Sequence, residues 1–242
     1  MRVILANPNA TVAITDACAT LGRAAAAPGT EIVPWTNRAG PPVVDGLGSD
    51  YLAGAALVRG LAAVAPRPDA IVLAGFGNYG TGAVKEVLDV LVVNMAEAAM
   101  AFAVPLCHRF AIVTTSPRMI AYTEDVVHAF GFAARCGAIR AVSLPAIDAP
   151  PLPDDAIVER LAAEAEQAHA TSGADLVILG GARLSPYAAA LRRRTTVTII
   201  EPVACGVAMA EALARIGLRQ SPVGKFASPS TPFAPTHDNA GL

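Results

Sequence analysis

The stretch DAIVLAG, at residues 69–75, recurs as DLVILGG at residues 175–181. The two stretches share aspartate, leucine and the final glycine at equivalent places, and small or apolar residues fill the other places. At the same offset of about 106 residues, Ala98-Ala99 corresponds to Ala204-Cys205. The stretch RVILAN near the start corresponds, close to this offset, to RFAIVT at 109–114. Three matches in one register indicate a duplicated structural unit.

Each half alternates short β-branched apolar runs with longer helical stretches. Strands are predicted near residues 2–6, 31–34, 70–74 and 91–94, and then near 110–114, 139–143, 176–180 and 197–200. Helices are predicted near 11–26, 50–65, 82–89 and 95–104, and then near 118–130, 154–170, 186–193 and 203–216. Continuous apolar runs suit parallel strands that are covered on both faces. The sequence therefore predicts an α/β fold with two pseudo-symmetric lobes, each a four-stranded, mainly parallel sheet flanked by helices.

The expected lobe boundaries follow from this rhythm. Residues 1–104 plus 207–220 are assigned to the first lobe, to which the last helix returns, and residues 105–206 are assigned to the second lobe. Residues 221–242 contain four prolines and little periodicity. This segment is predicted to be a mobile tail, or an arm that packs on a neighbouring subunit.

Composition excludes several classes of function. Of the 242 residues, 54% are hydrophobic and 16% are charged, which is the balance of a folded globule and not of a disordered segment. A net charge of −2 without a long basic stripe argues against nucleic acid as a partner. Charged residues, glycine and proline interrupt every apolar run before membrane-spanning length, and the N-terminus reads as a strand, so we expect no membrane and a cytoplasmic location. Four dispersed cysteines argue against a zinc site.

Ligands of open parallel α/β sheets bind beyond the carboxyl ends of the strands, where loops and helix N-termini present N–H groups. Small and polar residues from both halves gather at these ends: Asn7-Pro8-Asn9, Gly75 to Asn78, Thr114 to Ser116, and Gly181 to Arg183. We therefore expect Gly75 and Gly181 to face one cleft that holds a small anion. The glycine-rich run GFGNYGTG matches neither the dinucleotide nor the phosphate-loop pattern, so no such cofactor is predicted.

Six stretches, in order, resemble the aspartate/glutamate/hydantoin racemase superfamily, nearest the hydantoin and allantoin racemases. They are NPNAT at 7–11, FGNYG at 76–80, VVNMAEAAM at 92–100, HRFAIVTTSPRM at 108–119, LVILGGARL at 176–184 and VTIIEPVA at 197–204. The resemblance covers about residues 1–216. It implies two lobes around a small cleft, where two cysteines remove and return a proton next to a carbonyl without a cofactor. It also implies a homo-oligomer.

The sequence departs from this family at the centre of the pattern. The positions where the family carries its two cysteines are Gly75 and Gly181, and glycine has no side chain to transfer a proton. The superfamily also contains arylmalonate decarboxylases, with glycine at the first position but cysteine at the second. The resemblance thus implies a cofactor-independent isomerase-superfamily enzyme for a small carboxylate, hydantoin-like or amide substrate that stabilises an enolate or oxyanion. A lyase, a hydrolase or a non-catalytic binding protein on the same scaffold are the alternatives.

The candidate site residues are therefore those that can donate hydrogen bonds or move a proton. Substrate binding is assigned to Asn9, Gly75, Phe76, Gly77, Asn78, Thr114, Thr115, Gly181, Ala182 and Arg183, and proton chemistry to Tyr79 and Glu201. Each polar member has a structural alternative. Asn9 and the two threonines are typical helix caps, Tyr79 a lid or interface residue, and Arg183 a solvated side chain. Glu201 would stabilise the start of a helix, unless burial raises its pKa and makes it the missing base.

Overall fold

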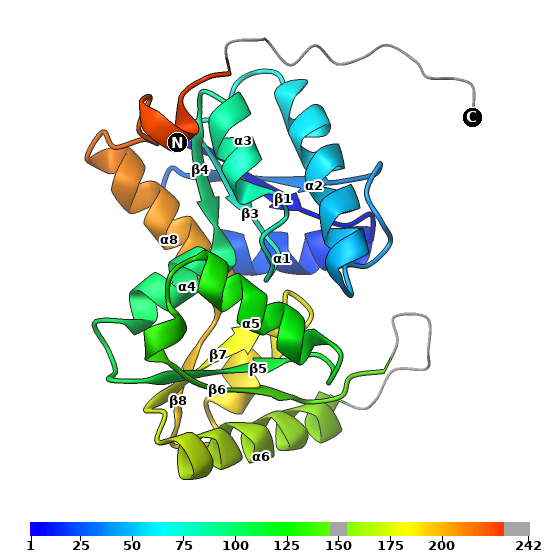
Figure 1. Cartoon of the computed structure of the whole chain (residues 1–242), viewed down its shortest axis with the longest axis vertical. Coiled ribbons are helices and arrows are strands. Elements are labelled where there is room, and N and C mark those ends of the chain that lie inside the picture. Colours follow the sequence, from blue (N-terminus) through cyan, green and yellow to red (C-terminus); the bar gives the residue numbers. More distant parts are fainter. Residues whose placement is uncertain (146–153, 230–242) are drawn as a thin grey trace.

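The computed structural model describes residues 1–145 and 154–229, which form two lobes stacked on each other (Figure 1). The first lobe contains β1 (Arg2–Asn7), α1 (Val12–Ala25), β2 (Glu31–Thr36), α2 (Leu47–Ala62), β3 (Ala70–Leu73), α3 (Thr81–Val87), β4 (Leu91–Asn94) and α4 (Met95–Ala103). The second contains β5 (Phe110–Thr114), α5 (Met119–Ala129), β6 (Cys136–Ala141), α6 (Asp154–Ser172), β7 (Leu176–Gly180), α7 (Ala188–Leu191) and β8 (Thr198–Ile200). Helix α8 (Pro202–Arg215) follows.

The two sheets have the same topology. Their strand orders are β2-β1-β3-β4 and β6-β5-β7-β8, and all pairs are parallel. The repeated stretches form β3 and β7, at the equivalent place in each sheet. The predicted α/β fold with two four-stranded parallel sheets is confirmed. The prediction for β6 was wrong in its bounds: the strand begins at Cys136, not near 139, because this half-buried edge strand carries a weaker apolar pattern.

Alternation along the strands places the apolar side chains in separate layers. In β1, Val3 and Leu5 face the core between the sheets, and Ile4 and Ala6 face the outer helices. Helices α1, α4, α5 and α8 fill the space between the two sheets, together with Phe110 of β5. Helices α2 and α3 cover the outer face of the first sheet, and α6 and α7 cover the outer face of the second.

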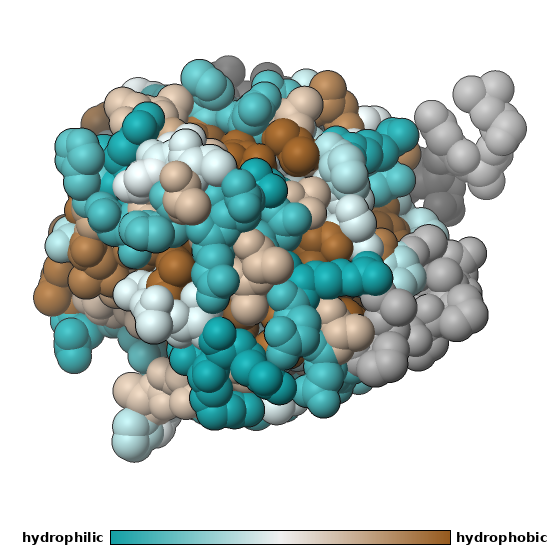
Figure 2. All heavy atoms as spheres, turned by 90° about the horizontal axis from the view of Figure 1, so that it is seen from below, coloured by the Kyte–Doolittle hydropathy of each residue, from teal (hydrophilic) through white to brown (hydrophobic). Residues whose placement is uncertain are grey.

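The outer helix α6 turns an apolar stripe inward, which includes Ile157, Leu161 and Ala165. The surface of the molecule on this side is chiefly hydrophilic, with small apolar patches between the polar side chains (Figure 2). Among the residues that the structure describes, no helix combines the length and the apolarity needed to cross a bilayer.

The segment after α8 returns to the first lobe. The Gln220 side chain pairs with the backbone of Val92, with bonds of 3.0 Å from Val92 N to Oε1 and 2.8 Å from Nε2 to Val92 O. A 3-10 turn over Gly224–Phe226 lies on α3, where the Lys85 ammonium is 5.7 Å from the Phe226 ring centre. The first part of the predicted tail is therefore folded onto the first lobe. Its remainder, residues 230–242, lies outside the described residues.

Candidate active site

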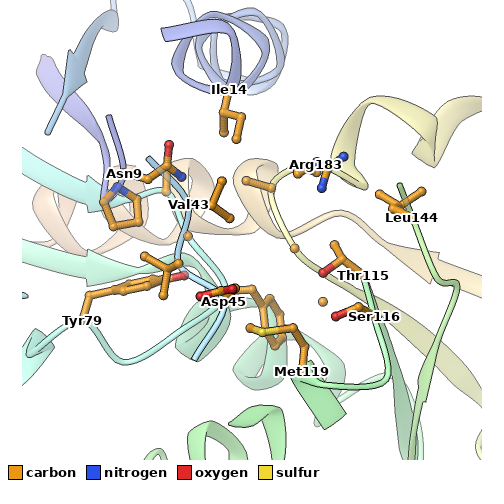
Figure 3. Close-up of a pocket in the computed structure, with 18 of the residues that line it drawn as sticks. Asn9, Ile14, Val43, Asp45, Tyr79, Thr115, Ser116, Met119, Leu144 and Arg183 are labelled. Atoms are coloured by element: carbon orange, nitrogen blue, oxygen red, sulfur yellow. The ribbon is translucent and has the colours of Figure 1, made fainter. Parts of the chain in front are cut away.

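A cavity of about 420 Å³ lies between the lobes, at the carboxyl ends of strands from both sheets (Figure 3). Loops that follow β1, β2, β3, β5, β6 and β7 contribute to its wall. The lining residues are Pro8, Asn9, Ile14, Val43, Val44, Asp45, Ala74, Gly75, Phe76, Tyr79, Thr115, Ser116, Met119, Leu144, Pro145, Gly180, Gly181, Ala182 and Arg183. The expectation that Gly75 and Gly181 line one cleft is thus met by the geometry.

The loop after β3 presents backbone donors to the cavity. Within the described ranges, the N–H groups of Gly75 and Phe76, which line the cavity, have no hydrogen-bond acceptor. Asn94 holds this loop from behind, because its Nδ2 donates to Gly77 O and to Thr81 Oγ1, both at 2.8 Å. Its Oδ1 accepts from Ala96 N and caps α4. A buried asparagine therefore fixes the donors of one cavity wall.

Tyr79 packs directly over this loop and lines the cavity. A Cβ at residue 75 would lie 2.5 Å from Tyr79 Cε2 and 2.7 Å from its hydroxyl oxygen, so only glycine fits beneath the ring. Gly77 is similarly covered and does not line the cavity. Tyr79 has a left-handed backbone with φ of +48°, which is unfavourable for a bulky residue. Its N–H donates to Asp50 Oδ1 at 2.8 Å, which helps to hold this conformation.

Two buried polar side chains, Asp50 and Tyr122, lie behind Tyr79. Tyr122 of α5 donates to Asp50 Oδ1 at 3.0 Å. Burial raises the pKa of the Tyr79 phenol far above its usual range, and the Asp50 charge adds to this effect. Burial also raises the pKa of Asp50, although hydrogen bonds from Tyr79 N–H and Tyr122 oppose the increase. Tyr79 is therefore a neutral hydrogen-bond donor at physiological pH.

The second-lobe wall is more open. A Cβ at Gly181 would meet one atom within 4 Å, the Thr115 methyl carbon at 3.0 Å. The Gly181 N–H donates to Leu179 O at 3.0 Å. This N–H is therefore not free to donate to a ligand, as the sequence analysis expected it to be. Arg183 donates from Nη2 to Pro145 O at 3.0 Å, and burial lowers the pKa of its guanidinium. Arg183 thus borders the cavity as a half-buried cation and not as a freely solvated side chain.

The two polar atoms of the Asn9 side chain have different surroundings. Its Oδ1 accepts from Asn7 Nδ2 at 3.1 Å and from Thr11 N at 3.0 Å, which orders the turn into α1. No acceptor for the Asn9 Nδ2 is found among the described residues, and Asn9 lines the cavity. Asn9 can therefore donate to a ligand without leaving the turn.

Besides Gly77, three predicted site residues lie outside the cavity wall. Thr114 is 1% exposed and donates to Gly180 O at 3.1 Å, which ties β5 to β7. Asn78 lies in the loop behind the wall and does not line the cavity. Glu201 caps α8, because Oε1 accepts from Val203 N and Oε2 from Ala204 N, both at 2.8 Å. Both Glu201 oxygens thus serve the helix, which favours its structural interpretation.

Sequence reasoning missed several lining residues. Ser116 was noted at a strand end but not assigned to the site, and Met119 begins the helix that follows. Asp45 comes from the long β2–α2 connection, where no local pattern marks it. Its carbonyl oxygen accepts from Arg118 Nε of the second lobe at 2.8 Å, so this loop joins the lobes beside the cavity.

Comparison with known proteins shows the family to which this chain belongs. Residues 3–210 match the family model described as Asp/Glu/Hydantoin racemase. The chain is 31% identical to a hydantoin racemase of Paenarthrobacter aurescens over 95% of this chain and 98% of that one. It is 30% identical to a hydantoin racemase of Pseudomonas sp. (strain NS671), over 95% and 92%. The crystal structure of an allantoin racemase from Pseudomonas fluorescens superposes with a TM-score of 0.90 at 34% identity, covering 96% of this chain and 98% of that one. The chain belongs to the Asp/Glu/hydantoin racemase family.

Proposed function

We propose that this protein is a cofactor-independent enzyme that labilises the proton next to a carbonyl in a small hydantoin-like, amide or carboxylate substrate. The names of the relatives, hydantoin and allantoin racemases, support the substrate class. The size of the cavity, about 420 Å³, suits a small ring with one substituent. The reaction class is isomerisation, since loss and return of that proton on opposite faces inverts the carbon.

The single observation that carries the proposal is the set of donors around Gly75. The N–H groups of Gly75 and Phe76, which line the cavity, have no acceptor in the described part of the chain, and the Tyr79 ring lies over Gly75. Preorganised donors of this kind stabilise the oxyanion of an enolate, each typically by about 3–4 kcal/mol. Arg183 and Asn9 would hold a second polar group of the substrate, which fixes the carbon against the donors.

The two-thiol mechanism is not part of this proposal. We infer that Gly75 and Gly181 occupy the positions that carry thiols in the racemases, which the sequence resemblance supports. At the first position, Tyr79 occupies the space and brings a hydroxyl in place of a thiol. At the second position the space is open, and a water molecule would fit beside Thr115 and Ser116. This open space also favours the alternative of a lyase or hydrolase that uses water on the second-lobe face.

The test is proton exchange at the reacting carbon. Single enantiomers of 5-benzylhydantoin and of allantoin are incubated with the protein in deuterium oxide and followed by NMR, mass and optical rotation. We expect deuterium incorporation with loss of optical rotation at constant heavy-atom composition. Tyr79→Phe should lower the exchange rate by about 10²-fold or more, in the range of acid–base groups. Tyr51→Phe, which alters a tyrosine that is 76% exposed, is the matched control.

The alternatives give different results in the same experiment. A change of mass without exchange into the starting compound would identify a lyase or hydrolase instead of an isomerase. Thermal stabilisation by a hydantoin without exchange or turnover would identify a binding protein and reject the enzymatic proposal.

A further inference from the structure

Tyr79 is held in an unfavourable backbone conformation at the wall of the central cavity (Figure 3). Its φ of +48° lies in the left-handed region, which a bulky residue adopts only where the surrounding structure imposes it. The ring covers Gly75, whose N–H group is one of the donors on which the proposed function depends. The groups that impose this conformation therefore determine where the Tyr79 hydroxyl lies relative to these donors.

Helix α2 holds the backbone of Tyr79 at two successive turns. Asp50 Oδ1 accepts from the Tyr79 N–H at 2.8 Å. One turn further along the helix, Gly54 lies against the same residue, since a Cβ there would be 2.9 Å from the Tyr79 carbonyl oxygen. Residues four apart lie on the same face of a helix, so one face of α2 fixes both the N–H and the carbonyl of Tyr79.

The second lobe reaches the same carboxylate oxygen. The Tyr122 hydroxyl of α5 donates to Asp50 Oδ1 at 3.0 Å, across the boundary between the lobes. Asp50 and Tyr122 are 7% and 6% exposed, so water competes little for this bond. A Cβ at Gly77 would overlap both the Tyr122 hydroxyl and the Tyr79 ring, so the two tyrosines meet over this glycine. A single buried oxygen thus joins the Tyr79 backbone to the second lobe.

We propose that Asp50 and Tyr122 are positioning residues, which act through Tyr79 and align its hydroxyl with the N–H donors of the central cavity. This inference rests on the proposed function, and it gives neither residue a proton to transfer. Asp50 fixes the backbone of Tyr79 by accepting its N–H, and Tyr122 fixes Asp50 from the second lobe. The alignment of Tyr79 consequently depends on both lobes, although Tyr79 itself belongs to the first.

Two substitutions at Asp50 separate the position of this side chain from its charge. Asp50→Ala removes the oxygen that accepts from the Tyr79 N–H and from the Tyr122 hydroxyl. Asp50→Asn keeps an oxygen at Oδ1 and removes the negative charge. With 5-benzylhydantoin in deuterium oxide as the probe, we expect Asp50→Ala to lower kcat for exchange by about 10²-fold, the scale of a misplaced reacting group. Asp50→Asn is the conservative rescue and should return kcat to within about 3-fold of the normal value, because a neutral acceptor makes only a somewhat weaker bond.

A double-mutant cycle with Tyr79→Phe shows whether Asp50 acts through the Tyr79 hydroxyl. Once that hydroxyl is removed, its alignment no longer affects the reaction, so Asp50→Ala should lower kcat by less than about 2-fold in the Tyr79→Phe background. Tyr122→Phe leaves the bond between Asp50 and the Tyr79 N–H intact, and should lower kcat by about 10-fold in the unaltered background alone. Asp16→Ala, which alters an exposed acid on α1, is the matched control and should exchange at the normal rate.

The outcomes separate this inference from the proposed function. Equal losses of kcat in both backgrounds, or a loss in Asp50→Asn as large as in Asp50→Ala, would overturn the positioning role and leave the proposed function standing. Normal exchange by both Asp50→Ala and Tyr122→Phe would overturn it in the same way. Absence of exchange in the unaltered protein would overturn the proposed function and this inference with it. Circular dichroism checks the folding of each variant, and if Asp50→Ala does not fold, the cycle with Tyr122→Phe decides.

Discussion

The phenol ring of Tyr79 fills the space that a side chain at residue 75 would need, with its hydroxyl 2.7 Å from the place of a Cβ. A side chain at residue 75 would therefore require the Tyr79 ring to move. At Gly181, the equivalent position in the second lobe, no ring occupies the space. The two walls of the cavity thus differ, although the duplicated fold makes their backbones alike.

This difference predicts unequal costs for adding one methyl group. Gly75→Ala forces the new Cβ against Tyr79 and against Pro8 Cγ at 2.6 Å, and should lower the free energy of unfolding by about 1–3 kcal/mol. Gly181→Ala meets the Thr115 methyl alone, and should change it by less than about 1 kcal/mol. Urea denaturation of the two variants measures both. Equal losses would contradict the inferred asymmetry of the walls.

The buried carboxyl of Asp50 predicts a pH dependence of stability. Burial raises its pKa in the folded protein above the value of 3.8, so the folded state binds the proton more tightly than the unfolded chain. The cost of burying the charge is fully present above the folded pKa and is relieved as the pH falls through it. The unaltered protein should therefore gain stability relative to Asp50→Asn between neutral pH and about pH 4. A difference that stays constant with pH, by urea denaturation, would rule this out.

A substitution at Asn9 should weaken ligand binding without destabilising the fold. Asn9→Asp keeps an oxygen to accept from Thr11 N and Asn7 Nδ2, so the turn into α1 is retained. It replaces the amide donor at the cavity with a charged acceptor, which should weaken an anionic or carbonyl ligand about 10-fold, or about 1.4 kcal/mol. Calorimetric titration with a hydantoin measures the change, and the thermal unfolding midpoint serves as the control. Binding of normal strength would remove Asn9 from the site.

Because Glu201 caps α8, its replacement should lower stability without lowering the exchange rate. Its carboxylate accepts from two N–H groups at the start of α8 and is 5% exposed. Glu201→Ala should lower the free energy of unfolding by about 1–2 kcal/mol, the usual cost of removing a cap. The exchange rate per folded molecule should stay the same. A large fall in that rate in a fully folded sample would instead restore the hypothesis that Glu201 is the base.

The sequence by itself determined the architecture. The repeat of DAIVLAG as DLVILGG, and the alternation of short apolar runs with helical stretches, predicted two parallel sheets and the strand ends where the cavity lies. These features depend on local periodicity and on the general geometry of parallel sheets, which the chain encodes within a few residues. The edge strand β6 was placed less well, because a half-buried strand has a weaker pattern.

Only the tertiary structure decided which polar groups face a ligand. Asn94, Asp50 and Tyr122 join the site from behind through hydrogen bonds that span up to 72 residues, and no spacing in the sequence signals such pairs. Thr114 and Glu201 have polar side chains like those that line the cavity, but their oxygens are hydrogen-bonded to the backbone. The end of a strand fixes the backbone position of a residue. The direction of its side chain and its hydrogen-bond partner depend on the neighbours that the folded chain places around it.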